Sequence, residues 1–222
     1  MSAVHDEATL REEICRVGAS LFARGYAHAT AGNISVRLAD GFLITPTDAC
    51  LGTLDPARLA RLDAEGRQLG GDRASKTLAL HLRIYDSDGD ARCVIHTHST
   101  HLVALTLQGV WTADDIVPPI TPYYVMKVGH VPLIPYHRPG APEAAEQVAR
   151  RIGAARAAGA PLRAVMMERL GPNVWHESPA AAMAVLEELE ETARLWLLGG
   201  RSATPLSASQ IDELRTAFGA RW

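Results

Sequence analysis

The segment with the strongest chemical signal is Cys93-Val-Ile-His96-Thr-His98-Ser-Thr-His101. Alternation along a strand places His96 and His98 on the same face, where both imidazoles can reach one metal ion. His101, one turn further on, lies at the rim of the same site. Catalytic zinc takes three protein ligands and keeps one position open for water or substrate. The spacing therefore predicts a divalent metal site, with Zn²⁺ as the expected ion. The alternative is a chance pair in which one ring is buried and hydrogen-bonded.

Three turns combine a small polar side chain with exposed backbone N–H groups: Gly32-Asn33, Thr45-Pro46-Thr47 and Ser75-Lys76. A helix that begins at Ser75 would attract an anion, and the Lys76 ammonium would add a full positive charge. Any one of these turns alone is explained by ordinary turn and cap chemistry. Together they predict a phosphate or carboxylate site formed by Asn33, Thr47, Ser75 and Lys76.

Two adjacent tyrosines, Tyr123 and Tyr124, follow Pro122. The simplest interpretation is that both side chains pack in the hydrophobic core. A tyrosine hydroxyl near a metal could instead donate a proton to a reaction.

The surrounding pattern predicts the elements that position these residues. Apolar spacing and turn residues alternate between helical and extended segments, with no internal repeat and no clear linker. We expect one α/β domain over residues 1–222, with a core at about 10–198 and a tail at 199–222. The expected helices cover residues 7–24, 75–85, 99–107, 141–159, 179–198 and a final one from about 209; the expected strands include 42–45, 91–98, 130–135, 162–167 and 173–176.

Composition limits the class of protein. The chain has 222 residues, of which 47% are hydrophobic, with a formal net charge of −3, so it lacks the basic excess of a nucleic-acid-binding surface. It has no apolar run of the ~20 residues that a membrane-spanning helix requires. The three dispersed cysteines, Cys15, Cys50 and Cys93, are typical of reduced thiols. We expect a soluble cytoplasmic protein.

In combination, residues 30–37, 43–47, 75–76 and 96–101 resemble the class II aldolase/adducin family. Residues 120–129, 135–136, 138–140 and 187–194 are similar to its branch of 3-oxo-tetronate 4-phosphate decarboxylases. The resemblance implies a three-layer α/β/α domain with a mainly antiparallel central sheet. It also implies a homotetramer with sites between neighbouring subunits, phosphate binding at Asn33, Thr47, Ser75 and Lys76, and zinc binding at His96 and His98.

Two positions depart from the family pattern. Leu170 stands where the family has its third zinc histidine, and Thr77 stands where it has an acid/base glutamate. The metal could recruit another ligand, bind through two histidines plus water, or be absent. The candidate replacement ligands are His101, His130, His137, His176 and Glu168.

The absence of the family's glutamate at position 77 distinguishes between the two candidate reactions, aldol cleavage and decarboxylation. Retro-aldol cleavage must remove a hydroxyl proton, whereas decarboxylation of a 3-oxo acid needs no base, only a cation and then a proton source. We therefore expect a metal-dependent carbon–carbon lyase that decarboxylates 3-oxo-tetronate 4-phosphate. The alternatives are a sugar-phosphate aldolase or epimerase of the fuculose or ribulose phosphate type, and a non-catalytic adducin-like binding module.

Overall fold

The computed structural model describes residues 6–222 and contains one eight-stranded sheet in the order β4-β3-β2-β1-β5-β8-β7-β6. Every neighbouring pair is antiparallel except β6 and β7. The sheet is therefore mainly antiparallel, as predicted. The strands are β1 (Asn33–Arg37), β2 (Phe42–Ile44), β3 (Ala60–Leu62), β4 (Gln68–Gly70), β5 (Cys93–His96), β6 (Leu133–Ile134), β7 (Ala164–Met167) and β8 (Gly171–His176).

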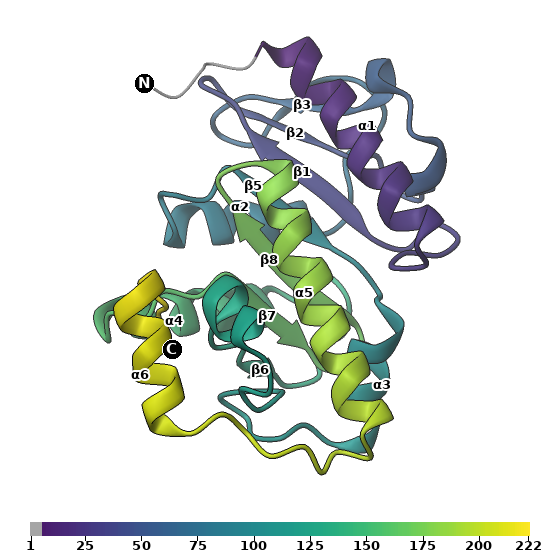
Figure 1. The fold of residues 1–222 in the computed structure, drawn as a ribbon. Helices are drawn as coiled ribbons and strands as arrows, with labels where there is room; N and C mark the ends of the chain where they lie inside the picture. The colour runs from purple at the N-terminus through teal and green to yellow at the C-terminus, as the bar shows by residue number, and fades with distance from the viewer. Residues whose placement is uncertain (1–5) are drawn as a thin grey trace.

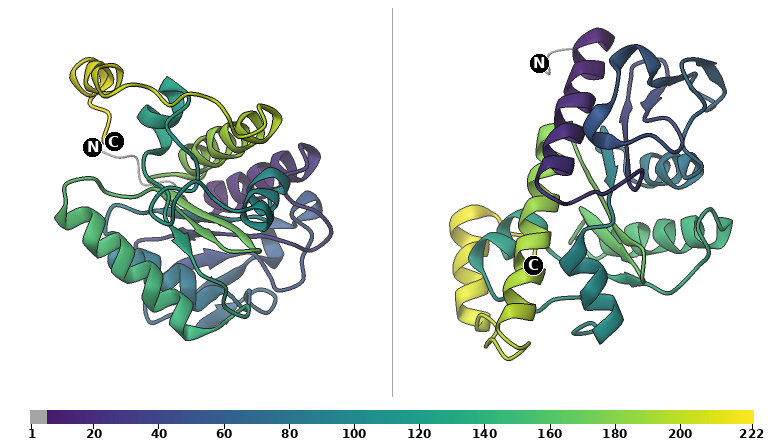
Figure 2. Two further views of the ribbon diagram at one scale, coloured as in Figure 1. Left: turned by 90° about the horizontal axis from the view of Figure 1, so that it is seen from below. Right: turned by 90° about the vertical axis from the view of Figure 1, so that its right-hand side faces the viewer.

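Helices cover both faces of this sheet, which gives the three predicted layers (Figures 1 and 2). One face packs against α1 (Glu7–Ala23), α3 (Thr100–Gln108) and α5 (Pro179–Leu198), and the other against α2 (Leu78–Ser87) and α4 (Pro142–Ala157). A π-helical turn, η3 (Tyr124–Val128), contacts both α5 and the last helix, α6 (Ala208–Phe218). Two short 3₁₀ turns, η1 (Leu51–Thr53) and η2 (Pro56–Arg58), lie against α1.

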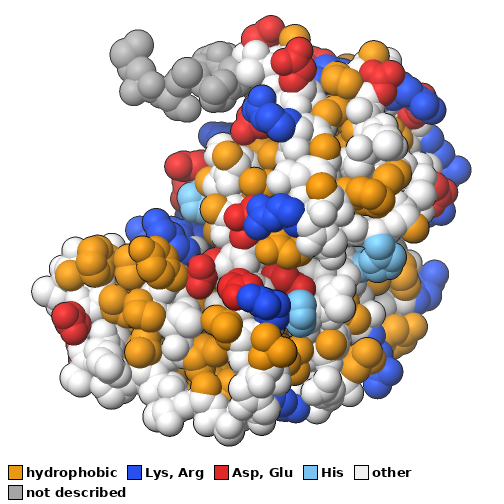
Figure 3. All heavy atoms as spheres, turned by 45° about the vertical axis from the view of Figure 1, so that its right-hand side comes forward, with side chains coloured by type: hydrophobic (Ala, Val, Ile, Leu, Met, Phe, Trp, Pro, Cys, Tyr) orange, Lys and Arg blue, Asp and Glu red, His pale blue; other side chains and the backbone are white. Residues whose placement is uncertain are grey.

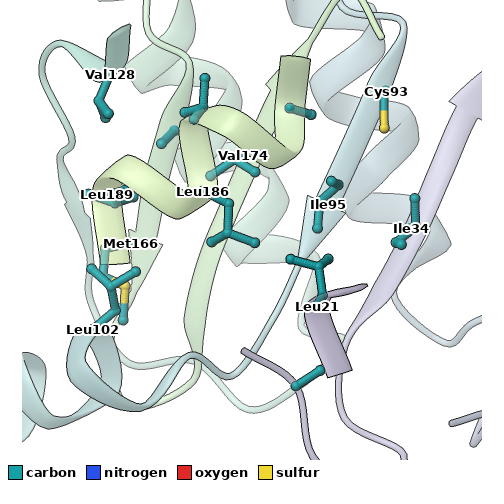
Figure 4. Packing of buried hydrophobic residues seen from close by; sticks show 14 of the residues in the cluster. Leu21, Ile34, Cys93, Ile95, Leu102, Val128, Met166, Val174, Leu186 and Leu189 are labelled. Atoms are coloured by element: carbon teal, nitrogen blue, oxygen red, sulfur yellow. The ribbon is translucent and has the colours of Figure 1, made fainter. Parts of the chain in front are cut away.

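The alternation of side chains along β5 divides the core in two. Cys93 and Ile95 point into the cluster beneath α1, α3 and α5, which Figure 4 shows around Leu186 and Val174. Val94 points into the opposite cluster, beneath α2 and α4. Because side chains alternate with a period of two, His96 shares the face of Val94. The side chain of His96 on the central strand β5 therefore faces the layer formed by α2 and α4.

Most predicted elements are present within a few residues of the expected bounds, but the helix predicted from Ser75 begins later. The first helical residue of α2 is Leu78, and Thr77 holds the N-cap position without a side-chain cap. Ser75 belongs to the preceding turn because its N–H donates to the Thr45 carbonyl at 3.2 Å and its own carbonyl accepts from Leu78 at 3.1 Å. The prediction that Ser75 is the N-cap is therefore wrong.

Among residues 6–222, the structure has no helix with the length and apolar character needed to cross a membrane.

Candidate active site

Three polar side chains form a row across the centre of the sheet. In the strand register, Asn33 of β1 lies opposite His96 of β5, and His96 lies opposite Asn173 of β8. Directly paired residues in antiparallel strands project to the same side. All three side chains therefore face the α2/α4 layer, and their exposed fractions are only 6%, 4% and 1%. We call this set the amide–histidine row.

The His96 ring is held in one tautomer. Its Nδ1 atom lies 2.8 Å from the carbonyl oxygen of Pro172. Because a carbonyl oxygen only accepts, Nδ1 carries the proton and Nε2 keeps its lone pair. Burial, with a contribution from nearby His98, lowers the pKa of His96 to about 4. A neutral imidazole fixed by a backbone carbonyl is the form in which histidine binds a metal ion.

His98 lies beside His96, just beyond the end of β5. The two ring centres are 5.0 Å apart. Two imidazoles bound to one Zn²⁺ at about 2.1 Å have ring centres about 5 Å apart. Burial lowers the pKa of His98 as well, with a smaller contribution from His28. The two rings therefore have the separation and the protonation state that a shared cation requires.

The amides of the row are buried without protein partners. The Oδ1 atom of Asn33 and both polar side-chain atoms of Asn173 make no hydrogen bond within residues 6–222. A buried polar atom left unpaired costs about 1–3 kcal/mol, so these atoms indicate a position for water or a polar ligand. Asn173 was not predicted from the sequence; its signal was a single amide near the start of a strand that is mainly apolar up to His176.

A pocket of about 220 Å³ opens onto the row between α2 and α4. His96 and Asn173 line its sheet side, Lys76 and Thr77 line the start of α2, and Leu170 contributes an apolar wall. His137 also lines the pocket, and its Nε2 atom is buried without a partner within the described chain. The pocket thus combines a histidine, an amide and an ammonium group at one end of the sheet.

The four predicted phosphate-binding residues lie along the same edge. An antiparallel β-bridge joins Pro46 to Ala74, so Thr47 lies opposite Arg73 on one side of the bridge and Ser75 lies opposite Thr45 on the other. Ser35 of β1 pairs with Ile44 of β2, and the N–H of Thr45 donates to the Ile34 carbonyl at 3.0 Å, so Asn33 follows directly on the contact with Thr45. The backbone N–H groups of Thr47 and Ser75 are already bonded to carbonyl oxygens. An anion here must therefore contact hydroxyl groups and the Lys76 ammonium, which is exposed and lies 3.4 Å from Asp48 Oδ2.

The two departures from the family pattern both lie at this pocket. Leu170 packs against the apolar cluster beneath α2 and α4, where it offers no ligand atom. The Thr77 hydroxyl lies 3.1 Å from the Ser75 hydroxyl. Neither residue supplies the chemistry of the histidine or glutamate that the family pattern would place there.

Three of the five candidate replacement ligands are bonded to other groups, and a fourth, His176, lies at the far end of β5. His101 Nδ1 lies 2.8 Å from the buried Glu190 carboxylate, and His130 Nδ1 lies 2.9 Å from Asp115. Glu168 accepts a hydrogen bond from the N–H of Tyr136 at 2.9 Å. His176 pairs with Cys93, at the opposite end of β5 from His96. Within residues 6–222, no group of three or more His, Cys, Asp or Glu side chains is assembled to hold a metal ion.

The two tyrosines lie away from the pocket of their own chain. Tyr124 is fully buried against Trp222, with ring centres 5.5 Å apart, and burial raises its pKa well above 10. Tyr123 is 62% exposed at the start of η3. Neither side chain lines the pocket around His96.

A second buried histidine, on α2, lies on the same side of the sheet as the row. His81 of α2 is fully buried, and its Nδ1 atom lies 2.7 Å from the Ser35 hydroxyl, which also contacts the Tyr85 hydroxyl at 2.8 Å. Burial, with a contribution from His96, lowers the pKa of His81 to about 3. This network ties α2 to β1 two residues along from Asn33.

Comparisons with known proteins show the family to which this chain belongs. The family of the Class II Aldolase and Adducin N-terminal domain matches residues 12–197. A 3-oxo-tetronate 4-phosphate decarboxylase from Cupriavidus necator is 57% identical, over 97% of this chain and 99% of that protein. The crystal structure of YgbL from Escherichia coli is 43% identical, covers 94% of this chain and 99% of that one, and superposes with a TM-score of 0.86.

A more distant structure has the same architecture. The L-fuculose-1-phosphate aldolase from Thermus thermophilus is 28% identical, covers 89% of this chain and 98% of that one, and has a TM-score of 0.73. The family match spans most of the chain, and the fold agrees with that of the matched structures. The chain therefore belongs to the class II aldolase and adducin family, a family of lyases.

Proposed function

We propose that this protein is a metal-dependent carbon–carbon lyase that decarboxylates a small phosphorylated sugar acid, 3-oxo-tetronate 4-phosphate. The observation that carries the proposal is the amide–histidine row, in which His96 and amide atoms without protein partners lie together on the face of the sheet that the pocket lines. The 57% identity to a decarboxylase of that substrate over nearly the whole chain supports it.

His96 and His98 are the residues that would hold the divalent ion, with Zn²⁺ as the expected metal. Their ring separation, the free Nε2 of His96 and their lowered pKa values fit that role. When bound, the ion supplies a positive charge that stabilises negative charge developing on the substrate ketone.

The chain's own residues orient the substrate. Lys76 and the hydroxyl groups of Thr47 and Ser75 bind the phosphate at the edge of the sheet. The amides of Asn33 and Asn173, which lack partners within residues 6–222, donate to or accept from the polar groups next to the phosphate. These contacts place the carboxylate and the ketone over the histidine pair.

The residue at position 77 favours decarboxylation over aldol cleavage. A threonine hydroxyl of ordinary acidity does not act as a general base at neutral pH. In decarboxylation the carboxylate carbon leaves as carbon dioxide, its bonding electrons pass toward the ketone, and a proton is then added to the carbon left behind. We further propose that the protein is a homotetramer and that Tyr123, exposed just before η3, supplies that proton to a neighbouring subunit.

The test combines metal analysis with an assay of carbon dioxide release from 3-oxo-tetronate 4-phosphate. We expect metal in the purified protein, turnover of this acid, and loss of both in a His96→Ala/His98→Ala double variant. A metal-loaded protein that leaves this acid intact but cleaves a ketose 1-phosphate to a triose phosphate and an aldehyde would be an aldolase instead.

Leu170 and Thr77 favour one further candidate, a non-catalytic binding module with the same fold. Such a module would keep its binding and assembly properties in the double histidine variant. The enzyme loses its metal and its activity in that variant, so the same measurement separates the two.

A further inference from the structure

The proposed substrate has two anionic groups, a phosphate and a carboxylate, and no residue has so far been assigned to bind the carboxylate. The pocket between α2 and α4 has a second polar region, formed by the loop that joins β6 to α4. His137 and Arg138 of this loop line the pocket together with His96 and Asn173. This region is therefore the place to look for a carboxylate subsite.

Arg138 is a cation of this region that has no carboxylate partner. Its side chain is exposed and makes no hydrogen bond or ion pair within residues 6–222. Arg83 also lines the pocket, but it is paired with Glu146 at 3.0 Å. Glu146 is the only carboxylate among the described residues that line the pocket. The guanidinium group of Arg138 is therefore free to bind an anion that enters the pocket.

A tight turn holds Arg138 at the start of α4. The Arg138 carbonyl accepts a hydrogen bond from the Ala141 N–H at 3.1 Å, and Gly140 between them has a φ of +80°. Proline at the second position and glycine at the third are the residues that a type II turn favours, and this turn has Pro139 and Gly140 there. The local sequence therefore fixes the backbone of Arg138 beside the first turn of the helix.

The first turn of α4 lies at the same region of the pocket. Ala141 holds the N-cap position without a side-chain hydrogen bond, and Pro142 and Ala144 line the pocket. The N–H groups at the start of a helix carry partial positive charge and attract anions.

A second and independent feature indicates a ligand in this pocket. Asn173 is 1% exposed, and neither of its polar side-chain atoms has a partner within the described chain. The Nε2 atom of His137 is also buried without a partner in that part of the chain. Polar atoms buried in this way need a polar ligand or water to complete their hydrogen bonds.

We propose that Arg138, together with His137 and the first turn of α4, forms the subsite that binds the carboxylate of the substrate. The proposal rests on the proposed function, because it names the group of that substrate which this part of the pocket recognises. A ketose phosphate without a carboxylate lacks the group that Arg138 binds. Arg138 is thus the residue that selects a sugar acid over a neutral sugar phosphate.

The contact is strongest before the reaction begins. When the bond to the carboxylate carbon breaks, uncharged carbon dioxide leaves and the bonding electrons pass toward the ketone. A proton added to the remaining carbon then gives dihydroxyacetone phosphate. Negative charge therefore moves away from Arg138 as the transition state forms. Loss of Arg138 should raise KM and leave kcat unchanged or higher.

The experiment measures KM and kcat for 3-oxo-tetronate 4-phosphate, and the inhibition constant of dihydroxyacetone phosphate, for the parent protein and for Arg138→Gln. Loss of a hydrogen bond to a charged group should raise KM by at least about 10-fold. The inhibition constant of the product should stay close to that of the parent, because the product has the phosphate and no carboxylate. Arg138→Lys should recover part of the lost affinity, since it keeps the charge and not the paired donors.

Arg150→Gln is the matched control, because Arg150 is an exposed residue of the same helix that does not line the pocket. It removes the same charge and should leave KM unchanged. An unchanged KM in Arg138→Gln would overturn the carboxylate subsite. An equal rise in KM and in the product inhibition constant would also overturn it, because Arg138 would then bind the phosphate. A parent protein that releases no carbon dioxide from the acid would overturn the proposed function, and the subsite with it.

Discussion

At the scale of single residues, the buried amides set the balance between stability and binding. Asn173 is 1% exposed and none of its side-chain polar atoms has a partner in the described chain, which costs folding free energy. A protein keeps such a group when a ligand uses it. The free energy that Asn173 costs in the empty protein should therefore be recovered when substrate binds.

Replacing Asn173 with leucine should separate these two effects. Removal of the unpaired amide should raise the free energy of unfolding by about 1 kcal/mol, while KM for the phosphorylated acid rises by at least about 10-fold. Thermal or urea unfolding and steady-state kinetics measure the two. Val174→Ala, one residue along and facing the opposite layer, should lose about 2 kcal/mol of stability with KM unchanged. A drop in stability in Asn173→Leu would contradict this account.

His81 should make the stability of the protein depend on pH. Its pKa is about 3 in the folded state against 6.5 for an ordinary histidine, so only the unfolded chain binds a proton between these values. The stabilisation is complete above pH 6.5 and is lost as the pH falls toward 3, by up to roughly 5 kcal/mol.

The measurement is the free energy of unfolding against pH for the parent and for His81→Asn, which keeps a hydrogen-bonding group near Ser35. The variant should show a shallower slope between pH 6.5 and 3. Parallel curves would mean that other groups cause the pH dependence.

At the scale of elements, the start of β8 controls the shape of the segment that carries the histidine pair. Gly171 has a φ of +137°, and a Cβ atom there would lie 1.9 Å from the carbonyl oxygen of Thr97. The residue between His96 and His98 is therefore in close backbone contact with β8. Any side chain at position 171 must push the two strands apart.

Gly171→Ala should lower the free energy of unfolding by about 3 kcal/mol, because the substitution adds both a steric clash and an unfavourable φ. It should also weaken Zn²⁺ binding by displacing the segment from His96 to His98. Gly153→Ala in α4 is the matched control. No neighbour would lie within 4 Å of its Cβ, so it should gain up to about 1 kcal/mol with no change in metal binding. Chemical denaturation and metal titration test both variants.

Elements that depend on local sequence patterns are the ones that the sequence predicts well. Local patterns predict most of the helices and strands, and α5 begins and ends where its periodicity predicts. The His96–His98 spacing predicts that the two rings lie close together, and their centres are 5.0 Å apart, although β5 ends at His96 and His98 lies outside the strand. Asn173 could not be found in this way, since its position beside His96 depends on the pairing of β8 with β5. The start of α2 was misplaced because the Ser75 backbone bonds to Thr45, a residue 30 positions earlier.

At the scale of the whole molecule, the exposed hydrophobic side chains are consistent with the proposed assembly. Tyr123, Leu198 and Phe218 are 62%, 72% and 65% exposed. Figure 3 shows hydrophobic side chains spread over the surface between charged groups. Association of copies would bury such residues, and the proposed homotetramer would have a mass of about four times the 23.9 kDa of one chain.

Mixed assemblies test whether Tyr123 serves a neighbouring subunit. Tyr123→Phe and His96→Ala/His98→Ala proteins should each be inactive as pure assemblies. Co-expressed in equal amounts, they should regain about a quarter of the parent activity, because that share of interfaces pairs an intact histidine site with an intact tyrosine. Light scattering should confirm the mass of four chains. A mixture that stays inactive would place the proton donor within the same subunit.

The pairing of β5 with both of its neighbours has a consequence for how this pocket can change. The three polar residues align only because two strand registers agree, and a slip of β5 by one position would turn His96 into the opposite layer. Single substitutions along the row, in contrast, change the ligand atoms and leave their positions intact. The strand backbone thus fixes where each side chain of the row lies. Evolution or design can therefore change the donor or acceptor atoms at one position without moving the others.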